Sequence, residues 1–160
     1  MITGIVSQYD YLAAHLLHRR KAAIVMQWLM VPVGLIGLFT ILAGNWKWGG
    51  IILCGGIGGL VGELVQTRVF LPRKVKKLYA QYKGIASPIT FEWDATRLIG
   101  RSEKGRGERQ WKDYAKVKED DRVFLLYITD HLFEVVPKGW FSEPDKLQEF
   151  RTYAQAGREI

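Results

Sequence analysis

Two hydrophobic patterns divide this 160-residue chain. Residues 22–44, AAIVMQWLMVPVGLIGLFTILAG, form a run of 23 residues without a charge. As an α-helix, at about 1.5 Å per residue, this run would span roughly 34 Å, enough to cross a hydrocarbon layer about 30 Å thick. A helix of this length in a soluble domain would show a polar face, and the run is too long for a cleaved signal peptide. It therefore predicts a transmembrane helix.

A second apolar run follows closely and predicts a second span. Its core is GGIILCGGIGGLVG, residues 49–62, which reaches a spanning length when its flanking residues are added. Four of its glycines stand four residues apart in pairs, a spacing that lets helices approach closely in lipid. We expect them to face the first span of the same hairpin, with a homodimer interface as the alternative; they are Gly55 with Gly59, and Gly58 with Gly62.

Glu63, at the end of the second run, has two interpretations. It stands about one turn from Arg68 and can reach the membrane interface, where a carboxylate costs little. An intramembrane proton or ion site would instead need a polar partner, for which Gln27 in the first span is the candidate. The first interpretation is favoured, and the second stays open.

Basic residues gather at the two outer ends of the hairpin and are nearly absent from the segment that connects its spans. A cluster at residues 18–21 precedes the first span, six Lys or Arg follow the second between 68 and 83, and the connecting NWKW segment at 45–48 holds only Lys47. The positive-inside rule therefore predicts a multi-pass protein with both termini in the cytoplasm. The candidates for contact with anionic lipid headgroups are Arg19, Arg20, Lys21, Arg73, Lys74, Lys76 and Lys77.

The distribution of charge argues against nucleic acid as a partner. The net charge is +7, but residues 1–83 carry ten Lys or Arg against two acids, and residues 84–160 carry 13 against 14. The excess is juxtamembrane, whereas a nucleic-acid-binding domain carries its basic patch on the folded part.

A short amphipathic helix is expected before the first span. Residues 8–20 place Tyr9, Leu12 and Leu16 on one stripe. The helix either lies on the membrane surface or packs on the soluble domain. His15 and His18 stand three residues apart with no third ligand, so headgroup contact or solvation is favoured over a metal site.

The second half of the chain has the period of β-strands. Residues 89–94 alternate between apolar and polar, and the run at 123–129 is typical of a central strand. Leu147, Phe150 and Ala154 mark an amphipathic terminal helix. The pattern predicts about six antiparallel strands in a small barrel or sandwich closed by that helix, at 89–94, 98–102, 108–111, 111–118, 123–129 and 132–136.

The segment VVPKGWFS, residues 135–142, joins the last strand to the helix. Pro137 lacks an N–H and ends strand pairing, and Gly139 permits a backbone reversal. Ser142 is expected as the N-cap, with an acidic residue three positions later. Lys138 and Trp140 have no such structural reason, so they are the candidates for contact with a partner.

These segments resemble the YcxB-like protein family. The resemblance rests on WKDYAKVKED at 111–120, FLLYIT at 124–129 and VVPKGWFSEPDKLQEF at 135–150. It implies a membrane α-helical hairpin followed by a cytosolic domain with a pleckstrin-homology-like (PH-like) fold. The expected domains are a juxtamembrane helix at 1–21, a hairpin at 22–67, a basic stalk helix at 68–83 and the PH-like domain at 84–160.

The sequence offers no catalytic set. Cys54 is the single cysteine and lies in a predicted span, and Glu119, Asp120 and Asp121 are more typical of a solvated turn than of a metal loop. We expect no enzyme activity, cofactor or metal. The expected function is that of a multi-pass protein of a bacterial inner membrane whose cytosolic domain binds a protein partner, in a narrower form an immunity protein that neutralises an interbacterial toxin. The alternative is an adaptor that senses anionic lipid.

Overall fold

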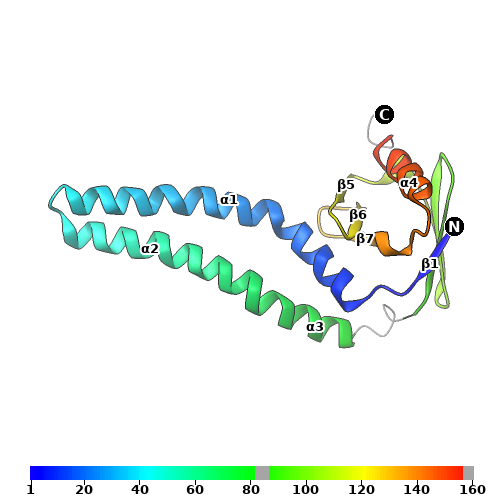
Figure 1. Ribbon diagram of the computed structural model, residues 1–160, viewed down its shortest axis with the longest axis horizontal. Helices are drawn as coiled ribbons and strands as arrows, with labels where there is room; N and C mark the ends of the chain where they lie inside the picture. Colours follow the sequence, from blue (N-terminus) through cyan, green and yellow to red (C-terminus); the bar gives the residue numbers. More distant parts are fainter. Residues whose placement is uncertain (82–86, 157–160) are drawn as a thin grey trace. The chain divides into compact units, whose positions relative to one another are not determined.

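The structure is a computed structural model that describes residues 1–81 and 87–156 (Figure 1). The chain forms two compact units. The hairpin unit is Arg19–Lys74, and the folded unit combines Met1–His18 with Val75–Ile160. The folded unit is therefore built from both sides of the hairpin in the sequence.

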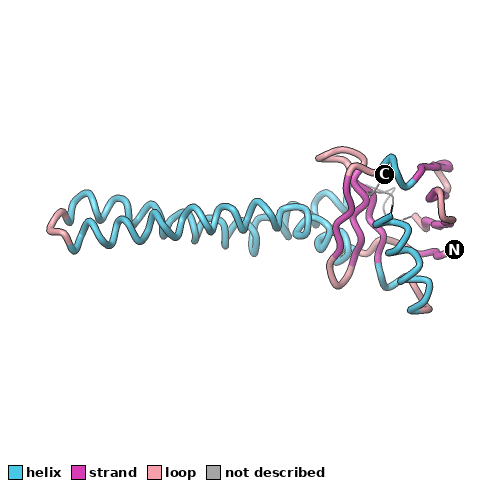
Figure 2. The backbone as a smooth tube through the Cα atoms, turned by 90° about the horizontal axis from the view of Figure 1, so that it is seen from above, coloured by secondary structure: helices cyan, strands magenta, loops and turns pink. Residues whose placement is uncertain are grey.

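Two long apolar helices form the hairpin, side by side in Figure 1 and Figure 2. They are α1 (Gln8–Leu42) and α2 (Trp46–Val65), and α2 continues through a π-helical turn, η1 (Gln66–Phe70), into α3 (Leu71–Gln81). Both helical segments are long and apolar enough to cross a membrane. Their most apolar windows are only 6% and 11% buried, unlike those of a helix in a soluble core.

The connection between α1 and α2 is shorter than expected. Gly44, with φ of 87°, donates to Ile41, and Asn45 donates to Thr40, so α1 ends in a Schellman motif that requires a glycine. Trp46 already begins α2. The NWKW segment is thus mainly the first turn of a helix rather than a loop.

Glycines on both helices set their contact. A Cβ atom added to Gly56 would lie 2.7 Å from the backbone nitrogen of Gly34, and one added to Gly37 would lie 2.4 Å from that of Leu53. Of the four glycines expected to form the ridge, only Gly59 faces α1, where a Cβ would meet Met30. The other three have open space around them and do not contact α1: Gly55, Gly58 and Gly62.

The α3 helix is amphipathic. It buries Leu71 and Val75 and exposes a basic face made of Arg73, Lys74, Lys76 and Lys77. The preceding π-helical turn has a physical reason in Pro72, because a proline lacks an N–H and its ring clashes with the carbonyl four residues earlier.

The folded unit contains two antiparallel sheets, which correct the expected barrel. Their strand orders are β1-β2-β3-β4 and β5-β6-β7. All six strands expected in the second half are present, as β2 (Ile89–Trp93), β3 (Arg97–Ser102), β4 (Gly105–Gln110), β5 (Lys116–Glu119), β6 (Val123–Tyr127) and β7 (Phe133–Pro137).

The barrel does not close because the two sheets are not joined by strand pairing. Between β4 and β5 the chain leaves the extended conformation and forms the 3-10 turn η2 (Trp111–Asp113). The expected strand over 111–118 is therefore wrong in its first part. Trp111 is still buried, because its indole nitrogen donates to the carbonyl of Asp94.

A seventh strand comes from the N-terminus and was not expected. β1 (Ile2–Gly4) pairs with β2, with Ile2 opposite Phe91 and Gly4 opposite Ile89. The Thr3 and Thr90 hydroxyls, also opposite each other, are 2.9 Å apart. The hairpin is thus inserted between two strands that are neighbours in one sheet.

Phe150 on the terminal helix α4 (Pro144–Ala156) is the centre of the main core. It is fully buried, as expected, and its ring centroid lies within 5.5 Å of four other aromatic rings, those of Trp93, Trp111, Phe124 and Phe141. α4 begins at Pro144, which places Glu143 and not Ser142 at the N-cap position.

The first part of α1 packs on the three-stranded sheet, which decides between the two alternatives for the N-terminal helix. It begins with a capping box in which Ser7 and Asp10 bond each other's backbone N–H. The buried face is not the expected stripe, because Tyr9 is 71% exposed. The face that contacts Val123, Leu125 and Tyr127 instead consists of small and medium-sized residues, Ala13, Ala14 and Leu17.

An ion-pair cluster holds the end of β5, the corner after β7 and α4 together. Glu119 accepts hydrogen bonds from Lys138 at 2.6 Å and from Arg151 through Nε and Nη2. Partial burial raises the pKa of Glu119. The hydrogen bonds and charges of Arg151 and Lys138 lower this pKa by more than burial raises it, so it falls below the ordinary value.

We predict that Gly56→Val destabilises the hairpin by about 1–3 kcal/mol, because the new side chain meets the backbone of α1. Gly55→Val is the matched control, since a Cβ at Gly55 meets nothing within 4 Å. The measurement is the thermal stability of the full-length protein in detergent. Equal losses for the two variants would contradict this helix interface.

We also predict that Glu119 makes the folded unit acid-sensitive. A lowered folded-state pKa gives stability that is present above the unfolded value, about 4.3, and lost as the pH falls through the folded value. Glu119→Gln should be less stable than wild type at pH 7 and should lose less stability between about pH 5 and 3. Tryptophan-fluorescence melts test this, with the exposed Glu149→Gln as the control expected to follow wild type.

Candidate binding groove between the two sheets

Glycines leave a hollow on the inner face of the four-stranded sheet. In the register of β2, β3 and β4, Gly100 stands between Phe91 and Gly107. Gly105 is two residues from Gly107 and shares its face. A Cβ at Gly107 would meet no atom within 4 Å, so the space above it is open.

Two adjoining cavities form one groove over this hollow. Their volumes are about 410 and 510 Å³, and both are lined by Ile89, Phe91, Ser102, Lys104 and Glu134. The first cavity is also lined by every residue from 104 to 109, and the second by every residue from 132 to 135. Because alternate residues of a strand point to opposite faces, these continuous runs show that the backbone edges of β4 and β7 border the groove.

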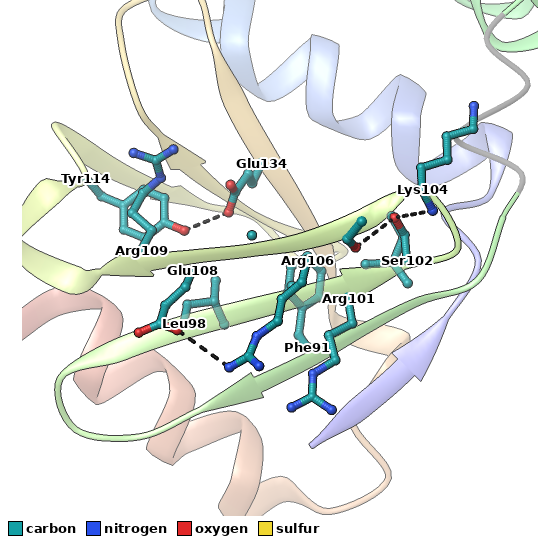
Figure 3. A pocket seen from close by; sticks show the side chains of 14 residues that line it. Phe91, Leu98, Arg101, Ser102, Lys104, Arg106, Glu108, Arg109, Tyr114 and Glu134 are labelled. Carbon is teal, nitrogen blue, oxygen red and sulfur yellow. Dashed lines mark hydrogen bonds and ion pairs between the residues drawn. The ribbon is translucent and has the colours of Figure 1, made fainter.

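Three polar side chains mark one end of the first cavity (Figure 3). Tyr114 is 3% exposed, and its hydroxyl donates to Glu134 Oε2 at 2.6 Å. The guanidinium of Arg109 lies 5.8 Å from the centre of the Tyr114 ring. Ser102 and Lys104 lie at the opposite end of the view.

Arg109 has no anionic partner in the described part of the chain. Its Nε is shielded from solvent and has no hydrogen-bond partner there. The outer face of the same sheet differs, since Arg101 pairs with Glu92, and Arg97 pairs with Asp94 and Glu108. Arg109 is thus a cation without a carboxylate partner in the described ranges, at the end of a partly apolar groove, and its Nε has no hydrogen-bond partner there.

The Tyr114 hydroxyl is held in its protonated form. Burial raises the pKa of Tyr114 most, and the charge and hydrogen bond of Glu134 raise it further, while Arg109 lowers it to a smaller extent. At neutral pH the protonated phenol donates its hydrogen bond to Glu134.

This site was not predicted from the sequence. The strand expected here covered only residues 108–111, whereas β4 begins at Gly105. The available signal was the two-residue spacing of Gly105, Gly107 and Arg109 on one face of a strand.

The two residues predicted to contact a partner lie within the folded unit's own contacts. Lys138 is 16% exposed in its side chain and belongs to the Glu119 cluster. Trp140 stacks on Phe91 and covers Gly4 so closely that a Cβ there would lie 2.4 Å from the indole. Trp140 therefore fixes β1 against the corner after β7.

The residues predicted to contact lipid headgroups lie in α1 and α3. On α3, none of the four basic residues forms an ion pair within the described ranges. On α1, Arg20 and Lys21 likewise have no ion pair there, but Arg19 lies 3.6 Å from Glu63. Glu63 also accepts from Thr67, so its polar partners are these two residues and not Gln27.

The histidines near the membrane segment belong to the folded unit. His18 Nδ1 lies 2.9 Å from the Tyr127 hydroxyl, and His15 contacts the Tyr11 and Phe133 rings. Both histidines are partly buried and contact rings of the folded unit, so they are not simply solvated as expected. Within residues 1–81 and 87–156, no group of three or more His, Cys, Asp or Glu side chains could hold a metal ion.

Comparison with known proteins identifies the second half of the chain. No curated protein and no solved structure shows a significant match. The family model described as YcxB-like protein matches residues 93–154, from the end of β2 to the last turns of α4. Residues 93–154 are therefore the YcxB-like part of this chain, which confirms the resemblance carried by its C-terminal motifs.

Proposed function

We propose that this chain is a two-span protein of a bacterial inner membrane whose folded unit binds a protein partner without catalysing a reaction. The observation that carries the proposal is the groove with two strand edges along it. An unpaired strand edge offers backbone N–H and C=O groups to an extended segment of another protein, and an adjoining groove can select its side chains.

The position of the hairpin in the sheet supports the proposed topology. Because β1 and β2 are paired and the hairpin lies between them in sequence, both ends of the hairpin return to one folded unit. Two membrane crossings place both flanking segments on the same side of the membrane, and their basic residues favour the cytoplasm as that side. Both termini are then cytoplasmic.

The strand arrangement supports a PH-like domain as the finer description of the folded unit. The folded unit has four strands in one sheet, three in the next and a C-terminal helix. In this chain the first of the seven strands is separated from the second by the membrane hairpin.

A narrower proposal is that the partner is an interbacterial toxin and the chain is its immunity protein. It is supported by the small size of the chain and by its apolar hairpin.

The prediction is that a photoreactive amino acid at the groove rim forms a protein adduct in living cells. Lys104 and Leu132 both line the groove, and Leu132 is 56% exposed, so they are the test positions. The exposed Lys112 and Thr152 are the controls. Adducts of one size from the rim alone support the proposal, and identical patterns from rim and control positions would contradict it. A toxin as the adduct, with loss of survival in cells lacking the chain, would support the immunity form.

The alternative function, recognition of anionic lipid, is favoured by the exposed basic face of α3. Basic residues beside a membrane contribute about 1 kcal/mol each to attraction by anionic lipid. The prediction is that full-length protein carrying Gln at positions 73, 74, 76 and 77 retains less phosphatidylglycerol in native mass spectrometry than wild type. Lys112→Gln with Lys146→Gln is the control. Unchanged retention would remove the support for this alternative.

A further inference from the structure

Of the three arginines that line the first cavity, Arg109 has no carboxylate within 4 Å in the described part of the chain, whereas Arg101 pairs with Glu92 and Arg106 with Glu108. Arginines and lysines on the outer face and in the Glu119 cluster have carboxylates within 4 Å. Glu134 also lines the groove, but it forms no ion pair with Arg109 and receives the Tyr114 hydroxyl instead. The charge of Arg109 is therefore not compensated by a carboxylate of the described residues, and its Nε has no hydrogen-bond partner among them.

Apolar side chains continue the groove from this polar end. Phe91, Leu98 and Ile89 line the first cavity, and Phe133 with Val135 line the second. A planar guanidinium can donate two parallel hydrogen bonds to a carboxylate, and such charge-assisted bonds gain strength where water is excluded. The combination suits an anionic group attached to an apolar body.

We propose that the groove recognises a carboxylate on an extended segment of the protein partner, with Arg109 as the residue that binds it and the glycine-lined hollow as the place for the adjoining apolar side chain. This inference rests on the proposed function, because the strand edges of β4 and β7 are what commit the occupant to a polypeptide.

The signs of the surrounding charges favour a single negative charge. A cationic group would meet Arg109 at one end and Lys104 at the other. A doubly charged phosphate would meet the carboxylate of Glu134 beside the one guanidinium. A carboxylate brings one negative charge, which the charge of Arg109 compensates, while Lys104 adds to the positive charge of the lining.

The experiment measures binding of a minimal carboxylate to the full-length protein in detergent. The probe is 4-(trifluoromethyl)benzoate, followed by fluorine NMR line broadening, with the neutral 4-(trifluoromethyl)benzamide and the cationic 4-(trifluoromethyl)benzylamine as comparisons. Partition into detergent is common to all protein variants, so differences between variants report the site.

Four variants locate and explain the binding. Arg109→Gln removes the charge, and Arg109→Lys keeps the charge but loses the planar fork. Gly107→Leu fills the hollow at a position where a Cβ meets no atom. Arg97→Gln is the matched control, because it removes an arginine from the outer face of the same sheet. Melting curves verify that each variant is folded.

The expected result is selective binding of the benzoate to wild type and to the Arg97→Gln control. Binding should be roughly tenfold to a hundredfold weaker in Arg109→Gln, and intermediate in Arg109→Lys. Gly107→Leu should abolish it. Equal binding by wild type and Arg109→Gln, equal binding of the three probes, or no binding to wild type would overturn the proposal.

A competition separates this inference from the proposed function. Benzoate in excess and Arg109→Gln should both lower the yield of the rim adduct with the partner. An adduct unaffected by either leaves protein binding intact and overturns the carboxylate site. Arg109-dependent benzoate binding without any protein adduct overturns the polypeptide occupant and identifies the groove as a site for a small free acid.

Discussion

The pairing of β1 with β2 is the constraint on which the rest of the structure depends. Three residues at the N-terminus, Ile2–Gly4, form an edge of the four-stranded sheet, and the whole hairpin lies between them and Ile89. Neighbouring antiparallel strands bring the two ends of any insert close together, so the apolar helices must leave and return as a pair. Trp140 reinforces this connection by packing over Gly4, which explains why a large aromatic residue that seems free in the sequence is held inside the unit.

Periodicity in the sequence predicted the elements whose side chains face a single environment. The two apolar helices, the alternating β2, the fully buried β6 and the face of α4 around Phe150 all belong to this class. β1 was not predicted, because a strand of three residues is too short to show an alternating pattern. The prediction of the buried face of α1 was wrong in its first part. Ala13 and Ala14, which pack closely on the sheet, are less hydrophobic than the exposed Tyr9 and Leu16.

The groove could not be predicted from periodicity, because it lies over a glycine position where no side chain fills the space. Gly107 matters through the open space above it, whereas the ring of Phe91 lies against Gly100, and the groove exists only because a second sheet, which the strand pattern does not place, stands over the first. The closed barrel expected from the strand count would have removed both free edges. The short 3-10 turn at Trp111–Asp113 interrupts pairing between β4 and β5, and so leaves the sheets separate.

Two partly buried cations of the folded unit, Lys138 and Arg109, differ in whether a carboxylate of the described residues compensates their charge. Lys138 lies over the Phe124 ring and meets the carboxylate of Glu119, which Arg151 also binds, so its charge is compensated within the chain. Arg109 lies near the Tyr114 ring in a similar way, yet its Nε has no partner within the described residues. Buried charges without a counter-charge are costly, and that cost is recovered when a carboxylate arrives. The same physical rule that makes Lys138 structural therefore makes Arg109 the residue through which this unit would select what it binds.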